Sequence, residues 1–217
     1  MLGLELGRTA RPLTILCLGA HSDDIEIGCG GTVLRLLAEH PGATVHWVVF
    51  SAADQRDEEA RASAADFTAA AGAVHVATHA FRDGFFPDAW AAVKAVFEQL
   101  KQAVVPDLVL THRTADAHQD HRVVGELTWN TFRDHFVAEY EIPKYEGDLG
   151  APNLYVPLTA ATAARKVDLL MQHFASQRSR RWFRPETFRA VLALRAIECN
   201  APDGAAEGLY APKLVLG

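Results

Sequence analysis

Cysteine is scarce in this sequence, with three residues among 217. Cys17, Cys29 and Cys199 are odd in number and lack the spacing of a metal knuckle, which argues against a disulfide scaffold and against a cysteine-bound metal. No segment resembles a secretory signal, and the apolar run 13–20 is too short to span a bilayer. These absences predict a cytoplasmic protein that inserts into no membrane.

Basic residues are also fewer than acidic ones. Lys and Arg number 21 against 27 Asp and Glu, so the formal net charge is −6. A nucleic-acid backbone would meet a field of like sign, and no nucleic-acid partner is expected. The most basic stretch, 178–184, holds four arginines interleaved with Trp182 and Phe183. A solvated face is the first interpretation of this stretch, and a subsite for an anionic substrate group is the alternative.

Repeats, linkers and low-complexity segments are absent as well. With 49% hydrophobic and 22% charged residues, the composition is that of a folded protein rather than a disordered one. The length is typical of one domain with an elaboration, and it allows a full hydrophobic core. We therefore expect a single domain over residues 1–217.

The first half of the chain alternates short apolar runs with longer helical segments. Strands are expected over 13–20, 43–51, 74–77 and 108–111, and helices over 32–39, 57–71, 89–104 and 122–137. Parallel neighbours in a sheet need crossover connections, and this alternation supplies them. The predicted fold class is α/β, with a mostly parallel sheet and helices on both faces.

The chain from about residue 140 onward has a different pattern. The segment 140–157 is rich in Pro, Gly and aromatic residues, which predicts a loop or an edge hairpin rather than a central strand. Helices are expected over 162–174 and 185–199. We interpret 140–217 as a rim that is attached to the sheet and shapes a substrate pocket.

Two polar clusters follow predicted strands. His21-Ser22-Asp23-Asp24 ends the first strand, and the fourth strand leads through His112 to His118-Gln119-Asp120-His121. Ligands bind at the carboxyl ends of the strands in open α/β sheets. Both spacings together would arise by chance about 0.02 times in a chain of this composition, so their combination is more informative than either motif alone.

Imidazole and carboxylate are ligands that suit Zn²⁺, and a catalytic zinc site holds three protein ligands beside an open position. His21, Asp24 and His121 can supply such a set, and Fe²⁺ or Co²⁺ would fit similar ligands. Asp23 and His118 would then lie beside the metal as acid–base candidates. The plainer alternative is that these residues form turns and helix caps.

The two motifs belong to a longer pattern. The segments 20–32 (AHSDDIEIGCGGT) and 116–121 (DAHQDH) resemble the LmbE-like/PIG-L family of zinc-dependent N-deacetylases. Shorter similarities occur at 56–59 (RDEE), 81–84 (FRDG) and 106–109 (PDLV). The resemblance implies a Rossmann-like sheet and hydrolysis that removes an acyl group, typically acetyl, from the nitrogen of a sugar or glycoconjugate by metal-activated water.

The resemblance also assigns residues to roles. It implies His21, Asp24 and His121 as zinc ligands and Asp23 as the general base. His118 is expected to assist the oxyanion or the leaving amine.

Three further positions lie near this set. Arg56 and Asp83 match segments that are expected to face the substrate. Asp120 is expected either to orient an imidazole as an outer partner of the metal site or to cap a helix. Ser22 and Gln119 stand where the family usually has proline, which predicts only altered turn rigidity.

Two other functions share parts of this pattern. An amidase acting on a thiol–sugar conjugate or another small amide would use the same residues. A nucleotide-binding Rossmann module without hydrolysis is a different class, but Gly28-Cys-Gly-Gly31 lacks the full Gly-x-Gly-x-x-Gly pattern. We expect these glycines to form a tight turn near the site. The expected partner is a small N-acetylated sugar or conjugate, and the oligomeric state stays open.

Overall fold

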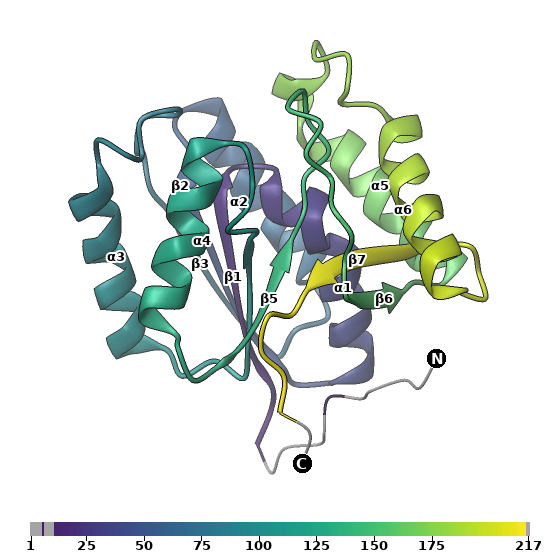
Figure 1. Cartoon of the computed structure of the whole chain (residues 1–217), viewed down its shortest axis with the longest axis horizontal. Helices are drawn as coiled ribbons and strands as arrows, with labels where there is room; N and C mark the ends of the chain where they lie inside the picture. The colour runs from purple at the N-terminus through teal and green to yellow at the C-terminus, as the bar shows by residue number, and fades with distance from the viewer. Residues whose placement is uncertain (1–5, 7–10, 216–217) are drawn as a thin grey trace.

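The computed structural model describes residue 6 and residues 11–215, so residues 1–5, 7–10 and 216–217 of the predicted domain lie outside it. A seven-stranded sheet has the order β3-β2-β1-β4-β5-β7-β6 (Figure 1). β1 to β5 are parallel neighbours, whereas β7 runs antiparallel to both β5 and β6. The strands are β1 (Thr14–His21), β2 (Thr44–Ser51), β3 (Ala73–Thr78), β4 (Leu108–His112), β5 (Phe136–Tyr140), β6 (Leu154–Pro157) and β7 (Ala206–Tyr210).

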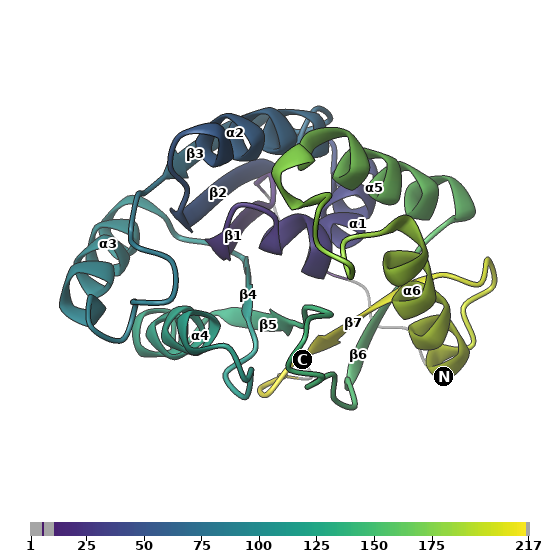
Figure 2. The same cartoon turned by 90° about the horizontal axis from the view of Figure 1, so that it is seen from above.

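Helices cover both faces of the sheet, so the predicted α/β class is confirmed (Figure 2). α3 and α4 pack on one face, while α1, α2 and α5 pack on the other and α6 lies against β6 and β7. None of the helices among the described residues is both long and apolar enough to cross a membrane. The helices are α1 (Asp24–Glu39), α2 (Gln55–Phe67), α3 (Trp90–Ala103), α4 (Gln119–Thr131), α5 (Ala160–His173) and α6 (Pro185–Cys199), with a short 3₁₀ turn at Ala175–Gln177.

Alternate residues of β1 enter two different cores. Ile15 and Cys17 pack with α1, α2 and α5, and Leu16 and Leu18 pack with α3 and α4. A strand with helices on both faces has no polar face, which explains its continuous apolar run. Burial on both sides fixes the end of β1, and the candidate site begins there.

The start of α1 differs from the prediction. The helix begins at Asp24 rather than Thr32. The prediction of a tight turn at 28–31 is therefore wrong, because this segment is helical with a kink at Cys29. The glycines serve close packing instead. A Cβ at Gly28 would collide with the ring of Tyr140, and one at Gly30 would lie 2.6 Å from the Phe67 ring.

The chain after the fourth predicted helix also differs. α4 ends at Thr131, and the segment 136–140, whose start was expected to be helical, is the central strand β5 beside β4. β7 was not predicted, because a strand containing Glu and Gly carries little strand signal of its own. The segment 140–157, expected as a loop or an edge hairpin, contains the edge strand β6.

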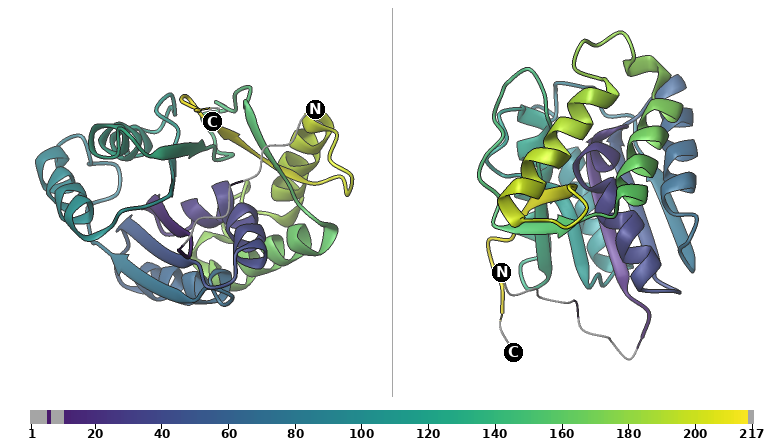
Figure 3. Two further views of the ribbon diagram at one scale, coloured as in Figure 1. Left: turned by 90° about the horizontal axis from the view of Figure 1, so that it is seen from below. Right: turned by 90° about the vertical axis from the view of Figure 1, so that its right-hand side faces the viewer.

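Two connections rise beyond the carboxyl ends of the parallel strands. The segment between β5 and β6 and the segment between α5 and α6 both stand at this end of the molecule (Figures 1 and 3). The basic stretch 178–184 lies in the second of these. The rim expected from residue 140 onward stays a prediction, and these connections are where it would lie. β6 and β7 of the same region extend the sheet itself.

Candidate metal and catalytic site

The candidate site lies where β1 and β4 end side by side. His21 is the last residue of β1 and Asp24 the first of α1, so both lie in one turn. β4 pairs in parallel with β1, and the connection that follows it leads to His121 in the first turn of α4. Adjacent parallel strands thus deliver both motifs to the same edge of the sheet.

His21, Asp24 and His121 converge on one point. Asp24 Oδ2 lies 3.2 Å from His21 Nδ1 and 3.5 Å from His121 Nε2, and the two ring nitrogens are 3.2 Å apart. All three side chains are buried. Ligand bonds of about 2.0–2.2 Å at tetrahedral angles place ligand atoms about 3.3 Å apart. The donor set and its spacing therefore fit a small divalent cation.

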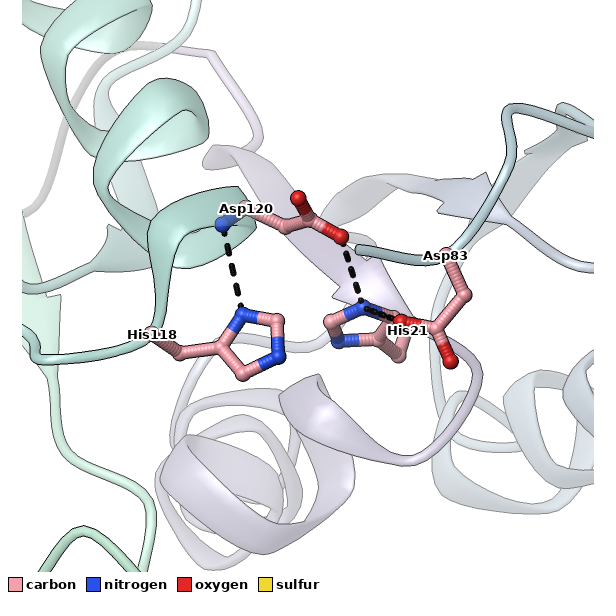
Figure 4. Close-up of side chains that lie close together, drawn as sticks. All are labelled: His21, Asp83, His118 and Asp120. Atoms are coloured by element: carbon pink, nitrogen blue, oxygen red, sulfur yellow. Dashed lines mark hydrogen bonds and ion pairs between the residues drawn. The ribbon is translucent and has the colours of Figure 1, made fainter. Parts of the chain in front are cut away.

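The other ring nitrogen of His21 faces two carboxylates. His21 Nε2 lies 3.0 Å from Asp83 Oδ1 and 3.3 Å from Asp120 Oδ2 (Figure 4). Asp120 is itself held by the backbone N–H groups of Gly84 and Phe86, at 2.6 and 3.1 Å. These carboxylates accept the Nε2 proton, which leaves the Nδ1 lone pair for a metal.

Of the two roles expected for Asp120, the structure gives it the contact with an imidazole. The N-cap residue of α4 is His118, whose Nδ1 accepts a hydrogen bond from Asp120 N. The ring of His118 stands edge-on to His21, with a centroid separation of 5.0 Å. His118 is half-buried at the mouth of the site. Its Nε2 is free of protein hydrogen bonds among the described residues and remains available to a ligand.

His121 has a matching carboxylate partner that received no role from the sequence. His121 Nδ1 lies 3.1 Å from Asp116 Oδ2, and this oxygen also accepts from Lys144 Nζ at 3.0 Å. Asp116 belongs to the second motif, so its position was a usable signal. Lys144 comes from the connection after β5 and has no local sequence signal that ties it to the site.

His112 is another buried group that sequence reasoning left unassigned. Its Nε2 accepts from Ala20 N at 2.9 Å and lies 3.1 Å from Asp24 Oδ2, and its ring stacks on His121 at 3.9 Å. Two other groups of His and Asp lie close enough together to be considered as metal sites, one with His112 and one with Asp120. Asp24 Oδ2 also accepts a backbone hydrogen bond, from His21 N at 2.6 Å, so the three groups overlap in one continuous cluster of His and Asp side chains.

Electrostatics prepare Asp24 and His121 for a cation. Burial alone would raise the pKa of Asp24, but His121, His112 and His21 outweigh burial and hold that pKa well below its usual value. Burial, together with His112, lowers the pKa of His121 to about 3. An ionised carboxylate and a neutral imidazole are the forms that bind metals. Burial would lower the pKa of His21, but Asp24, Asp120 and Asp83 outweigh burial and raise that pKa well above its usual value, so a cation would have to displace a proton there.

Asp23 precedes Asp24 in this turn and belongs to none of the close His and Asp groups of the described residues. It is buried, and its Oδ1 accepts a hydrogen bond from Arg56 Nη2 at 3.2 Å. Burial, reinforced by the neighbouring charge of Asp24, raises the pKa of Asp23 to about 6. Asp83, whose side chain is 60% exposed, has its pKa lowered to about 2, first by its hydrogen bond from His21. The structure thus brings every residue predicted for the site into one neighbourhood.

Comparison with protein families gives a match over residues 16–132, more than half of the chain, to the model described as PIG-L: GlcNAc-PI de-N-acetylase. The chain belongs to the PIG-L (LmbE-like) family. The match contains both histidine motifs and ends where α4 ends. A comparison with curated protein sequences finds no significant match.

Solved structures share the fold of this PIG-L family chain. The conserved protein TT1542 from Thermus thermophilus is 20% identical, with a TM-score of 0.74 over 94% of this chain and 97% of that one. GalB, the 4-carboxy-2-hydroxymuconate hydratase from Pseudomonas putida, is 19% identical, with a TM-score of 0.71 over 94% and 98%. The N,N'-diacetylchitobiose deacetylase from Pyrococcus horikoshii is 18% identical, with a TM-score of 0.65 over 91% and 83%.

Proposed function

We propose that this protein is a metal-dependent hydrolase that removes an N-acyl group, typically acetyl, from an amino sugar or a sugar conjugate. The observation that carries the proposal is the convergence of His21 Nδ1, Asp24 Oδ2 and His121 Nε2 within 3.2–3.5 Å of one another, beside the buried carboxyl of Asp23. Membership of the family described as GlcNAc-PI de-N-acetylase supports the substrate class. The deacetylase from Pyrococcus horikoshii shares this fold.

His21, Asp24 and His121 would hold the cation, with Zn²⁺ as the first candidate and Fe²⁺ or Co²⁺ as alternatives. When bound, such a cation polarises the amide carbonyl and lowers the pKa of water. Asp120 and Asp116 keep the two rings turned toward it through hydrogen bonds from His21 Nε2 and His121 Nδ1.

Asp23 takes the role of general base. A carboxyl whose pKa is raised to about 6 can accept the proton of an attacking water near neutral pH and return it to the departing nitrogen. Arg56 holds Asp23 Oδ1 at 3.2 Å and so fixes the direction of this carboxylate. Arg56 Nε is buried, but the side chain is 29% exposed, so the outer N–H groups of its guanidinium can also reach the substrate.

His118 and Asp83 complete the substrate side of the site. The free Nε2 of His118 would donate a hydrogen bond to the oxyanion that develops on the acyl carbon, or to the leaving amine. Asp83 extends from the loop after β3 and is the most exposed residue of the group, which suits a contact with sugar hydroxyls. The connections 141–153 and 174–184 would shape the rest of the pocket (Figure 1).

The glycine segment 28–31 supports hydrolysis over nucleotide binding. Its residues are buried in α1 against Tyr140 and Phe67, so their backbone cannot approach a pyrophosphate as a dinucleotide fingerprint does. A hydratase is the second candidate, because GalB shares the fold over nearly its full length. Fold alone does not separate the two reactions.

One experiment separates these candidates. Purified protein is loaded with Zn²⁺, Fe²⁺ or Co²⁺ and incubated with N-acetylated sugars, nucleotide sugars and glycoconjugates, and also with thiol–sugar amides and unsaturated hydroxy acids. Release of acetate with an equal amount of free amine from a sugar is the expected result. Hydration of the unsaturated acids without any amine release would overturn the proposal in favour of the hydratase.

A further inference from the structure

The kink in α1 is bridged by two charged side chains from distant parts of the chain. In an unbroken helix the N–H of Gly31 would donate to the carbonyl of Ile27. Here Gly31 N donates to Glu207 Oε1 at 2.8 Å, while Ile27 O accepts from Lys166 Nζ at 2.7 Å. Lys166 Nζ and Glu207 Oε1 are 2.5 Å apart. The ion pair from α5 and β7 thus takes the place of one helical hydrogen bond.

Glu207 also caps the second half of the kinked helix. Its other oxygen accepts from both Thr32 N and Thr32 Oγ1, each at 2.6 Å. Glu207 and Lys166 are each 3% exposed, so the whole arrangement is buried. The backbone groups of Ile27, Gly31 and Thr32 that the kink releases are therefore paired with charged partners, which keeps the helix bent at Cys29.

The first half of the helix carries the chemistry. Asp23 is the N-cap residue of α1 and Asp24 is its first residue. Ile27 N donates to Asp23 O at 3.0 Å, and the carbonyl of the same residue accepts from Lys166. One residue, Ile27, thus connects Lys166 to the turn that presents the candidate base and a candidate metal ligand.

We propose that Lys166 and Glu207 are positioning residues, which hold the first turn of α1 at the angle where Asp24 meets His21 and His121. Without the pair, the helix gains by straightening, because Gly31 N and Ile27 O can then bond to each other. Straightening moves Asp24 away from the two rings. The proposal rests on the proposed function for its consequence, metal affinity, but not for its structural part.

A second buried ion pair provides a matched control. Arg195 Nε lies 2.7 Å from Glu141 Oε1, and these residues are 2% and 6% exposed. Arg195 lies in α6 and Glu141 directly follows β5, in the same region of the chain as Lys166 and Glu207. Among the described residues, neither member forms a hydrogen bond or an ion pair with α1. Glu141 lines the same small cavity as Ile27, Lys166 and Glu207, and Arg195 packs against Gly208. Removal of the pair therefore reports the loss of a buried charge pair in the same surroundings, without the loss of a hydrogen bond to α1.

The test compares two double variants, Lys166→Met/Glu207→Gln and Arg195→Met/Glu141→Gln. Replacing both partners leaves no unpaired buried charge, so both variants are expected to fold. Lys166→Gln/Glu207→Gln, which keeps a polar but uncharged side chain at both positions, is a milder variant should the first double variant not fold. Hydrogen exchange is measured on the metal-free proteins for a peptide covering 23–31, and Zn²⁺ affinity by competition with a chromophoric chelator.

We expect faster exchange over 23–31 and a metal Kd weakened about tenfold or more in the Lys166 variants alone. Equal changes in the control pair would overturn the proposal, because they would reflect general loss of stability. Faster exchange with unchanged metal affinity would overturn it too. Should wild-type protein bind no metal, the proposed function fails, while exchange over 23–31 still decides whether the pair positions the turn.

Discussion

Residues 14–132 and 136–210 both bury charged side chains, but they arrange them in opposite ways. In the later region each buried cation meets a carboxylate directly, as in Lys166–Glu207 and Arg195–Glu141. In the earlier region two adjacent carboxylates, Asp23 and Asp24, lie among the imidazoles of several histidines with one arginine at the edge.

The difference separates charged pairs that hold backbone segments in place, including the first turn of α1, from charged groups that would contact a ligand directly. A buried pair with matched partners needs nothing further, and replacing it as a unit is often neutral. Where carboxylates cluster with imidazoles, the negative charges are not fully balanced by protein cations. Their pKa values are shifted as a result, and binding of a cation or a polar substrate becomes favourable. This contrast predicts different responses to substitution in the two regions.

The largest effect is expected from His121→Ala. Removing one of three candidate ligands should abolish stoichiometric metal binding and lower deacetylation by at least about 10⁴-fold, beyond the contribution of one acid–base group. Metal content by elemental analysis and amine release measure the two effects. His75→Ala, at an exposed position of β3, is the control. Full metal content in His121→Ala would contradict the ligand set.

Asp23→Asn is expected to separate catalysis from metal binding. The amide has nearly the same shape but cannot accept a proton, so activity should fall by about 10²–10⁴-fold while metal content stays at the wild-type level. Relief of the repulsion between Asp23 and Asp24 should leave the melting temperature unchanged or raise it. Near wild-type turnover in this variant would show that another group is the base.

Asp120→Asn tests the carboxylate behind His21 and should have a smaller effect. The variant weakens the acceptor for His21 Nε2–H and for the backbone of Gly84 and Phe86. Metal affinity or activity should fall by about 10–100-fold, the range for partners of metal ligands. Titration with Zn²⁺ and a chelator measures the affinity. An unchanged affinity together with unchanged activity would limit Asp120 to anchoring the loop after β3.

The two regions also differ in how far the sequence predicts them. In the earlier region the signals are local: apolar runs mark β1, β2 and β4, and the His and Asp spacing within single turns marks the site. Both motifs follow strands that are parallel neighbours, so their convergence follows from topology. His112 was missed as a functional residue because a histidine that ends a strand has no distinguishing spacing.

In the later region the determinants are nonlocal. β7 is short and contains Glu207, whose hydrogen-bond partners on α1 are 175–176 residues away in sequence. No local sequence pattern therefore predicts this strand. Lys144 likewise reaches Asp116 from a connection with no periodicity. The glycines at 28–31 indicate a turn by composition, yet the helix continues because Tyr140 and Phe67 pack where side chains would be. Tertiary contacts decide all three cases.

The smallest effect on the candidate site is expected from substitutions in the Arg195–Glu141 pair. Arg195→Met alone leaves Glu141 buried without its partner and should lower the free energy of unfolding by about 3–5 kcal/mol. The double variant Arg195→Met/Glu141→Gln should recover most of that loss. Urea denaturation measures both, and metal content should match wild type throughout. If the double variant were as unstable as the single one, shape and hydrogen bonding rather than charge matching would explain the pair. The contrast between the two regions would then lose its electrostatic basis.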